Sequence, residues 1–355
     1  MNVVKTSGTK INIAISWSGI PAYGARLIRE GIKRLGHPVI VIGTMPQMST
    51  KDSEELLGQK IYWIDKSNVN SWHDIDLSIP DIFFQAGWFI PSFNKLGREV
   101  RDNGGKVICL IDNCWKNNIR QWMGAVKFRF FYKKWFSAVW VPGESAVHLM
   151  RFFGMPSSQI YTGLYGSDSN CFTPGPILTQ RPKQFIFIGQ FIARKGVSTL
   201  AKAFKIFHQD FPDWKILVYG AGEYKNLLES CPGVIVHPFM QSLQIADALK
   251  RSRFLVLPSI EDHWPLVVSE AALTGCGLIL SDRVGNRYEF LNKKNGFIFK
   301  AKSVNELSEK LKEAASLPGW KLNEVYNESK RLSSFYVHTH WAEKFHQIIS
   351  EIRSS

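Results

Sequence analysis

Residues 257–275 read Leu257-Pro258-Ser259-Ile260-Glu261-Asp262-His263-Trp264-Pro265-Leu266-Val267-Val268-Ser269-Glu270-Ala271-Ala272-Leu273-Thr274-Gly275. A buried strand is predicted to end at Leu257 and an apolar helix to cover Leu266–Thr274. Because two helical turns take about seven residues, Glu270 can project toward a ligand cleft while Asp262 lies at the helix entrance. Such carboxylates are suited to accept hydrogen bonds from vicinal hydroxyl groups. A charge in an apolar helix requires a partner, so a structural salt bridge is the alternative reading of Glu270.

Strand and helix patterns alternate on both sides of this stretch, and the alternation occurs twice along the chain. Strands are predicted at Ile11–Ser16, Val39–Gly43, Ile82–Ala86, Val107–Ile111, Ala138–Val141, Gln184–Gly189, Trp214–Tyr219, Val234–Val236, Phe254–Leu257 and Gly277–Leu280. Helices are predicted at Ala22–Leu35, Ser92–Asn103, Glu144–Phe153, Val197–Phe211, Ser242–Arg251, Leu266–Thr274 and Ser303–Ala315. This α/β alternation predicts parallel sheets covered by helices on both faces.

The length of 355 residues and a Pro/Gly-rich segment near residue 178 predict two domains. We expect an N-terminal Rossmann-like domain over 1–175, a C-terminal one over 176–335, and a last helix over 336–355 that crosses back to the first domain. Two doubly wound domains that face each other bind their ligand in the cleft at the carboxyl ends of the strands. The loops that follow the strands are therefore where chemistry is expected.

The composition is that of a globular protein with a strong basic excess. Hydrophobic residues make up 45% of the chain, and 44 Lys and Arg residues against 30 Asp and Glu residues give a net charge of +14. The excess favours anionic partners. The apolar run Pro265–Leu280 is shorter than the roughly 20 residues that span a bilayer. The five cysteines lack disulfide or zinc-ligand spacing, so we expect no metal and a reducing cytoplasm.

Phosphate-binding candidates follow two other predicted strands. Arg194 and Lys195 stand at a strand-to-helix turn, where two cations and the helix N-terminus can hold a diphosphate, although a solvated Arg-Lys pair is about as plausible from this feature alone. Gly189, Gly220 and Gly222 close two strands, where glycine lets the backbone approach a ligand. A plain tight turn is the other explanation of the Gly-Ala-Gly sequence at 220–222.

The segment 113–141 contains basic and aromatic residues and no acidic residue. A basic helix rich in aromatic residues can lie on an anionic bilayer, and we predict such a contact through residues 115–136. A core-packed helix with a solvated cationic face explains the pattern equally well. No nucleic-acid-binding motif is present, so a nucleic acid partner is not expected. Asp74-Ile75-Asp76 is interpreted as a solvated turn rather than a metal-binding motif.

These residues resemble the retaining glycosyltransferases of family 4 (glycosyl transferases group 1), which have the GT-B fold of two facing Rossmann-like domains. The hallmark of the family is a Glu or Asp followed by Glu eight positions later, after a Pro-Ser, and Asp262 and Glu270 match it. Ser281–Gly285 and Asn295–Phe297 are similar to the segment that follows the next strand. Gly19 precedes Gly36-His37 by a spacing that resembles the family's glycine loop.

The resemblance implies a role for each candidate. Glu270 would hold the nucleotide ribose, Asp262 the hydroxyls of the donor sugar, and Arg194 and Lys195 the diphosphate. Six further candidates are expected to contribute main-chain contacts to the donor: Gly19, Gly189, Gly220, Gly222, Leu266 and Val267. Asp112 or Asn113 would stand in for a family histidine on the acceptor side.

The activity that the resemblance implies is transfer of a sugar from a nucleotide-diphosphate sugar to a hydroxyl group with retention of configuration. No cofactor or metal is expected beyond this donor substrate. We expect a lipid-linked saccharide acceptor, a role in bacterial polysaccharide or lipopolysaccharide synthesis, and a cytoplasmic location, peripheral on the inner face of the membrane. Gln190 stands where many family members have Arg, and the family histidine is missing, so a non-catalytic scaffold of a polysaccharide-assembly complex remains an alternative. A sugar-nucleotide epimerase of the same two-domain shape would also bind a nucleotide diphosphate and is the other alternative.

Overall fold

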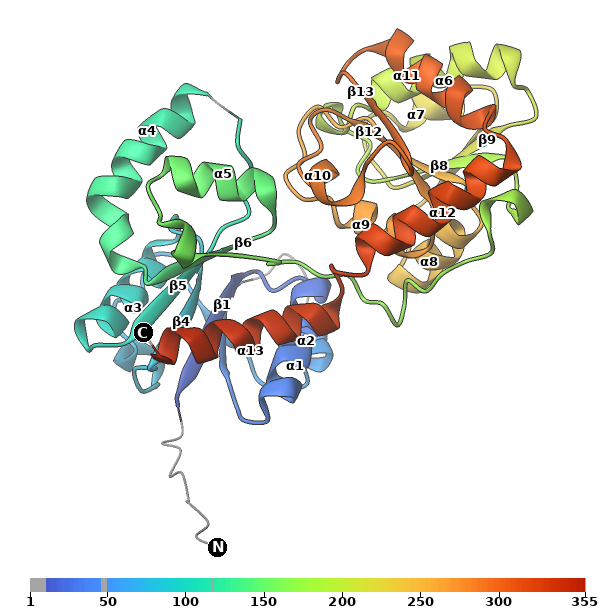
Figure 1. The fold of residues 1–355 in the computed structure, drawn as a ribbon. Helices are drawn as coiled ribbons and strands as arrows, with labels where there is room; N and C mark the ends of the chain where they lie inside the picture. The colour runs from blue at the N-terminus through green and yellow to red at the C-terminus, as the bar shows by residue number, and fades with distance from the viewer. Residues whose placement is uncertain (1–10, 46–49, 117, 355) are drawn as a thin grey trace, which may run out of the picture. The chain divides into compact units, whose positions relative to one another are not determined.

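The computed structural model describes residues 11–45, 50–116 and 118–354 of the chain. It divides into two compact units (Figure 1). Of the described residues, the first unit takes those within 11–141, 146–164 and 341–354, and the second takes 142–145 and 165–340. Each unit has one parallel sheet with its own buried core, as the α/β alternation predicted.

The sheet of the first unit has seven strands in the order β3-β2-β1-β4-β5-β6-β7. Its strands are β1 (Ile13–Ser18), β2 (Ile40–Thr44), β3 (Tyr62–Ile64), β4 (Ile82–Ala86), β5 (Lys106–Leu110), β6 (Ala138–Val141) and β7 (Ile160–Thr162). The α-helices are α1 (Ala22–Leu35), α2 (Thr50–Leu57), α3 (Pro91–Asp102), α4 (Ile119–Lys127), α5 (Glu144–Phe152) and α13 (His338–Ser354). Shorter helical turns are η1 (His73–Ile75), η2 (Phe128–Tyr132), η3 (Lys133–Trp135) and η4 (Ser157–Gln159).

The sheet of the second unit has six strands in the order β10-β9-β8-β11-β12-β13. Its strands are β8 (Gln184–Ile188), β9 (Lys215–Tyr219), β10 (Val234–His237), β11 (Phe254–Leu257), β12 (Gly277–Ser281) and β13 (Gly296–Phe299). Its helices are η5 (Leu178–Gln180), η6 (Ala193–Lys195), α6 (Val197–Asp210), α7 (Lys225–Glu229), α8 (Ser242–Lys250), α9 (Leu266–Leu273), α10 (Arg287–Phe290), α11 (Val304–Ala315) and α12 (Gly319–Ser333).

The C-terminal helix α13 packs on the first unit (Figure 1). The Trp341 side chain is buried, stacks on Trp140 of β6 at 5.0 Å between ring centroids, and donates from Nε1 to the Leu164 carbonyl at 2.8 Å. A Cβ on Gly31 of α1 would lie 2.8 Å from the Trp341 ring. Glycine at this position therefore lets α13 lie close against α1.

Two sequence expectations concern helical turns of the first unit. The Asp74–Asp76 segment forms a turn, as predicted, because η1 ends at a left-handed Asp76 and the Asp74 carboxylate accepts from Asn70 N at 2.8 Å. The single helix expected across the basic segment is wrong. The chain forms α4, the π-helical η2 and the 3₁₀ turn η3 instead, and residue 117 lies outside the described residues. No helix among the described residues is long and apolar enough to cross a bilayer.

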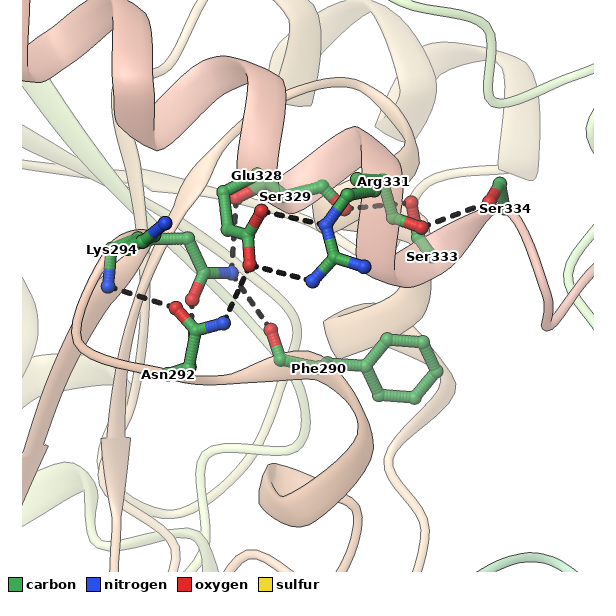
Figure 2. Close-up of polar contacts among 9 residues, drawn as sticks. Phe290, Asn292, Lys294, Glu328, Ser329, Arg331, Ser333 and Ser334 are labelled. Carbon is green, nitrogen blue, oxygen red and sulfur yellow. Dashed lines mark hydrogen bonds and ion pairs between the residues drawn. The ribbon is translucent and has the colours of Figure 1, made fainter.

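A network of charged and amide groups ties the loop before β13 to helix α12 (Figure 2). Arg331 donates two hydrogen bonds to the Glu328 carboxylate, both at 2.8 Å. Asn292 Nδ2 donates to the same carboxylate at 2.6 Å, and Asn295 Nδ2 donates to the Phe290 carbonyl at 2.8 Å. The Arg331 hydrogen bonds, opposed by some desolvation, lower the pKa of Glu328 to about 2.

This pKa predicts an acid-sensitive contribution to the stability of the second unit. Because the pKa of Glu328 is lower in the folded than in the unfolded chain, the contribution is present above about pH 4.5 and is lost as the pH falls toward 2. Glu328→Gln keeps an oxygen acceptor for Asn292 and removes the charge. We expect its urea midpoint to lie below that of the wild type at pH 7 and to converge with it near pH 2.

Glu324→Gln is the matched control, since Glu324 lies one turn earlier on α12 and forms an ion pair with Lys321. The difference in urea midpoint between Glu324→Gln and the wild type should change less with pH than the difference for Glu328→Gln. Parallel pH profiles for wild type and Glu328→Gln would contradict the assignment of the lowered pKa to Glu328.

Candidate functional site

The loop 258–265, between β11 and α9, is held in place by the neighbouring strand β12. Ser281 Oγ at the end of β12 donates to the Ser259 carbonyl at 2.5 Å, and Asn286 Nδ2 donates to the Pro265 carbonyl at 3.0 Å. Between these two anchors, Gly285 N donates to the Asp262 carbonyl at 2.8 Å. The main chain on both sides of the Asp262 side chain is therefore fixed.

The turn between β8 and α6 holds the same loop from the other side. Ile260 N donates to the Arg194 carbonyl at 2.8 Å, and the Arg194 guanidinium donates to the Glu261 carbonyl at 2.9 Å. Gly196 has a φ of 70°, and a Cβ there would lie 1.9 Å from the Pro258 carbonyl oxygen. The strand-to-helix turn predicted around Arg194 is present, and it packs directly on the loop that carries Asp262.

Lys195 and Asp262 form an ion pair within this contact. Lys195 Nζ lies 2.5 Å from Asp262 Oδ2, and the two side chains are only 14% and 11% exposed. Ser259 Oγ donates to the same carboxylate oxygen at 3.2 Å. The structure therefore brings together the residue expected to bind a diphosphate and the residue expected to bind sugar hydroxyls. Arg194, in contrast, is exposed to solvent.

Helix α9 presents three of the predicted residues on one face. Leu266, Val267 and Glu270 are partly exposed, whereas the other five residues of α9 are buried. Positions three and four residues apart lie on the same side of a helix, so Glu270 lies one turn below Leu266 and Val267. Pro265 at the N-cap offers no side-chain cap, which leaves the first N–H groups of α9 suited to an anion.

The three predicted glycines hold the loops after β8 and β9 together. Gly220 has a φ of 152°, and a Cβ on it would lie 2.0 Å from the Gly189 carbonyl oxygen. A Cβ on Gly222, where φ is 149°, would lie 2.5 Å from the Phe191 carbonyl oxygen. The close approach of the two loops thus requires glycine at both positions, and this packing accounts for the glycines whether or not a ligand binds there.

Glu289 is a residue that the sequence reasoning missed. Its Oε1 accepts from Glu144 N at 2.7 Å, and burial raises the pKa of its carboxyl to about 7. Its Oε2 and the Oδ1 of Asn286 are buried without a hydrogen-bond partner in the described structure. No local signal separates Glu289 from a surface glutamate, because burial is decided by the packing of α10.

The two remaining predicted residues belong to the first unit. Gly19 follows β1 with a φ of 68°, and its N–H donates to Thr44 Oγ1 at 3.2 Å. Asp112 follows β5 and is exposed. Within the described ranges, no group of three or more His, Cys, Asp or Glu side chains could hold a metal ion.

The second unit matches a known protein family. Residues 176–332 fit the family described as "Glycosyl transferases group 1". A Bacillus subtilis protein, TuaC, whose name assigns it provisionally to teichuronic acid biosynthesis as a glycosyltransferase, is 31% identical over 124 residues. The match covers 35% of this chain and 31% of TuaC, so this chain matches about a third of its curated relatives' length.

Two solved structures are similar over nearly the whole chain. A glycosyltransferase from Rickettsia africae has a TM-score of 0.78 at 14% identity and covers 98% of this chain and 99% of its own. Alr3699/HepE of Anabaena, solved in complex with UDP, has a TM-score of 0.76 at 13% identity and covers 97% of this chain and 100% of its own. The predicted GT-B fold is confirmed.

The packing of Gly220 makes a testable prediction. Gly220→Ala should destabilise the second unit by about 1–3 kcal/mol, because alanine is strained at this φ and its Cβ meets the Gly189 carbonyl. Urea unfolding followed by tryptophan fluorescence measures the change. Gly319→Ala is the control, since the nearest atom to a Cβ there is 3.5 Å away. Equal stabilities of the two variants would contradict the close approach of the loops.

Proposed function

We propose that this protein, whose residues 176–332 match the glycosyl transferases group 1 family, transfers a sugar from a nucleotide-diphosphate sugar to a hydroxyl acceptor with retention of configuration. The observation that carries the proposal is the Lys195–Asp262 pair at the same sheet edge as the exposed face of α9. Cations for a diphosphate and carboxylates for hydroxyl groups are thereby available on neighbouring loops.

Each side chain has a specific task in this proposal. Glu270 accepts hydrogen bonds from the ribose hydroxyls, and Asp262 accepts from hydroxyls of the donor sugar. Lys195, the exposed guanidinium of Arg194 and the N–H groups of Leu266 and Val267 contact the diphosphate. UDP is the first nucleotide to test, because the structurally similar Alr3699/HepE was solved with UDP.

The chemical step needs stabilisation of the leaving group rather than a nucleophile from the protein. The bond between the anomeric carbon and the diphosphate oxygen breaks, and the acceptor oxygen bonds to that carbon on the same face. The acceptor proton passes to the departing phosphate. Negative charge that develops on the diphosphate is stabilised by Lys195, Arg194 and the start of α9.

We assign the acceptor to the lipid-linked saccharides of polysaccharide assembly, for which the name of TuaC is one support. A second support is an apolar face on α4 of the first unit. Its side chains recur at spacings of three and four residues, and each is more than half exposed: Ile119, Trp122, Met123 and Val126. Phe130 and Phe131 of η2 are exposed as well, and Ala125 is the one buried residue within α4.

Basic side chains surround this apolar face. Arg120, Lys127 and Arg129 are exposed on α4 and η2, and no acidic residue occurs between 113 and 141. Trp122 is more than half exposed although its ring contacts Phe152, and this exposure supports the membrane interpretation over a core-packed helix. An exposed apolar stripe flanked by cations fits an anionic bilayer, where a lipid-linked acceptor would be held.

Donor binding is expected to depend on Glu270. Charge-assisted hydrogen bonds contribute about 1.5–3 kcal/mol, so Glu270→Ala should weaken nucleotide binding on the order of 10- to 100-fold. Titration calorimetry with UDP, GDP, dTDP and their sugar conjugates measures the loss. Glu309→Ala, which removes an exposed carboxylate on α11, serves as the control.

Three results would argue against the proposal. A folded Glu270→Ala variant with the affinity of the wild type would remove Glu270 from the site. A wild-type protein that binds none of these nucleotides would favour the scaffold alternative. Conversion of the nucleotide sugar without any acceptor would favour an epimerase.

Membrane binding is expected to depend on the apolar face of α4. Trp122→Glu should reduce binding to vesicles of phosphatidylcholine and phosphatidylglycerol by about ten-fold or more, because it removes an exposed apolar side chain that would insert into the bilayer and adds repulsion from the anionic lipid. Cosedimentation measures the binding, which should weaken with salt. Trp320→Glu, on an exposed residue of α12, is the control. Equal binding by both variants would contradict the assignment.

A further inference from the structure

The Lys195–Asp262 ion pair connects the two kinds of donor recognition that the proposed function assigns to this edge of the sheet. Lys195 comes from the turn after β8 and Asp262 from the loop after β11, and these strands are neighbours in the sheet. Their charged atoms are 2.5 Å apart and both side chains are largely buried. At this distance and burial the attraction between the charges is strong, and neither charge is easily left alone.

A diphosphate that binds Lys195 therefore competes with Asp262 for the ammonium group. The incoming phosphates also bring negative charge close to the carboxylate. Besides the Lys195 ammonium group, the Asp262 carboxylate accepts a hydrogen bond from the Ser259 hydroxyl at 3.2 Å. A diphosphate alone offers the carboxylate no hydrogen-bond donor to replace the ammonium. The hydroxyl groups of a donor sugar offer several.

We propose that this ion pair makes the site discriminate a nucleotide-diphosphate sugar from the free nucleoside diphosphate, an inference that rests on the proposed function. A free diphosphate weakens the ion pair between Lys195 and Asp262 and gives Asp262 no new hydrogen bond in its place. A nucleotide sugar both weakens the ion pair and gives Asp262 new hydrogen bonds, because its hydroxyl groups donate to Asp262 while its diphosphate binds Lys195. Once the sugar has been transferred, the ion pair between Lys195 and Asp262 forms again, and its formation favours release of the diphosphate.

Neighbouring charges do not share this arrangement. The Arg194 guanidinium donates to the main-chain carbonyl of Glu261, which is an uncharged acceptor. The Glu261 carboxylate is about half exposed and lies 3.4 Å from His263 Nε2. Glu261 therefore supplies a matched control, one residue from Asp262 and of the same charge.

The test compares the affinities of free diphosphates and their sugar conjugates in Asp262→Asn and Glu261→Gln. Calorimetric titrations use UDP, GDP and dTDP, each with and without an attached glucose. We expect the wild type to bind one conjugate more tightly than the matching diphosphate. Asp262→Asn should bind that free diphosphate on the order of ten-fold more tightly and lose the preference for the conjugate. Glu261→Gln should retain the wild-type preference.

A double-mutant cycle identifies the ion pair as the cause. In a Lys195→Met background, Asp262→Asn should tighten binding of the free diphosphate much less, because the competition for Lys195 has been removed and only the repulsion between the carboxylate and the phosphates remains. Circular dichroism and thermal unfolding verify the fold of every variant. If Asp262→Asn does not fold, Asp262→Ser removes the same charge and takes its place.

The outcomes separate this inference from the proposed function. If Asp262→Asn leaves the affinity for the free diphosphate unchanged or weakens it, the competition is refuted, while selective binding of a nucleotide sugar by the wild type still supports sugar transfer. If Asp262→Asn tightens diphosphate binding equally in the Lys195→Met background, the ion pair is not the cause and the inference fails. A folded wild type that binds no nucleotide overturns both.

Discussion

The close approach of two loops at Gly196 is the constraint on which the candidate site depends. A side chain at this position would collide with the Pro258 carbonyl, so only glycine allows the turn after β8 to lie against the loop after β11. From that contact follow the main-chain bond from Ile260 to Arg194 and the ion pair between Lys195 and Asp262. Two segments more than sixty residues apart in the chain thereby form one polar surface.

Adjacent cations in the sequence have different surroundings in the structure. Arg194 is exposed and supports the main chain of the Asp262 loop, whereas Lys195 is largely buried and neutralised by a carboxylate. A substitution at Arg194 thus removes a hydrogen bond to the loop, whereas a substitution at Lys195 leaves the largely buried charge of Asp262 without its counter-ion. Arg194 and Lys195 carry the same charge, and the difference between them lies in how far each side chain is buried.

Elements with a strong periodic pattern were predictable, and short ones were not. Helix α1 and strands β4, β6 and β11 have the bounds that their apolar patterns predict. The three-residue strands β3 and β7 were missed, because they lie at the sheet edges and are too short to alternate. The basic segment after β5 was expected as one helix. It breaks into three pieces because Phe128 and Phe136 turn into the core while the apolar face of α4 stays exposed.

The sequence by itself determined the two-sheet α/β architecture, the positions of Arg194, Lys195 and Asp262 after the ends of strands, and the position of Glu270 in the helix that follows, because hydrophobic periodicity and glycine placement are local properties of the chain. Only the tertiary structure decided that Lys195 faces Asp262, that Gly220 packs on Gly189, and that Glu289 is buried with a pKa of about 7. The physical reason is that partners and burial depend on which strands are neighbours in the sheet, and strand order is not encoded in any single segment.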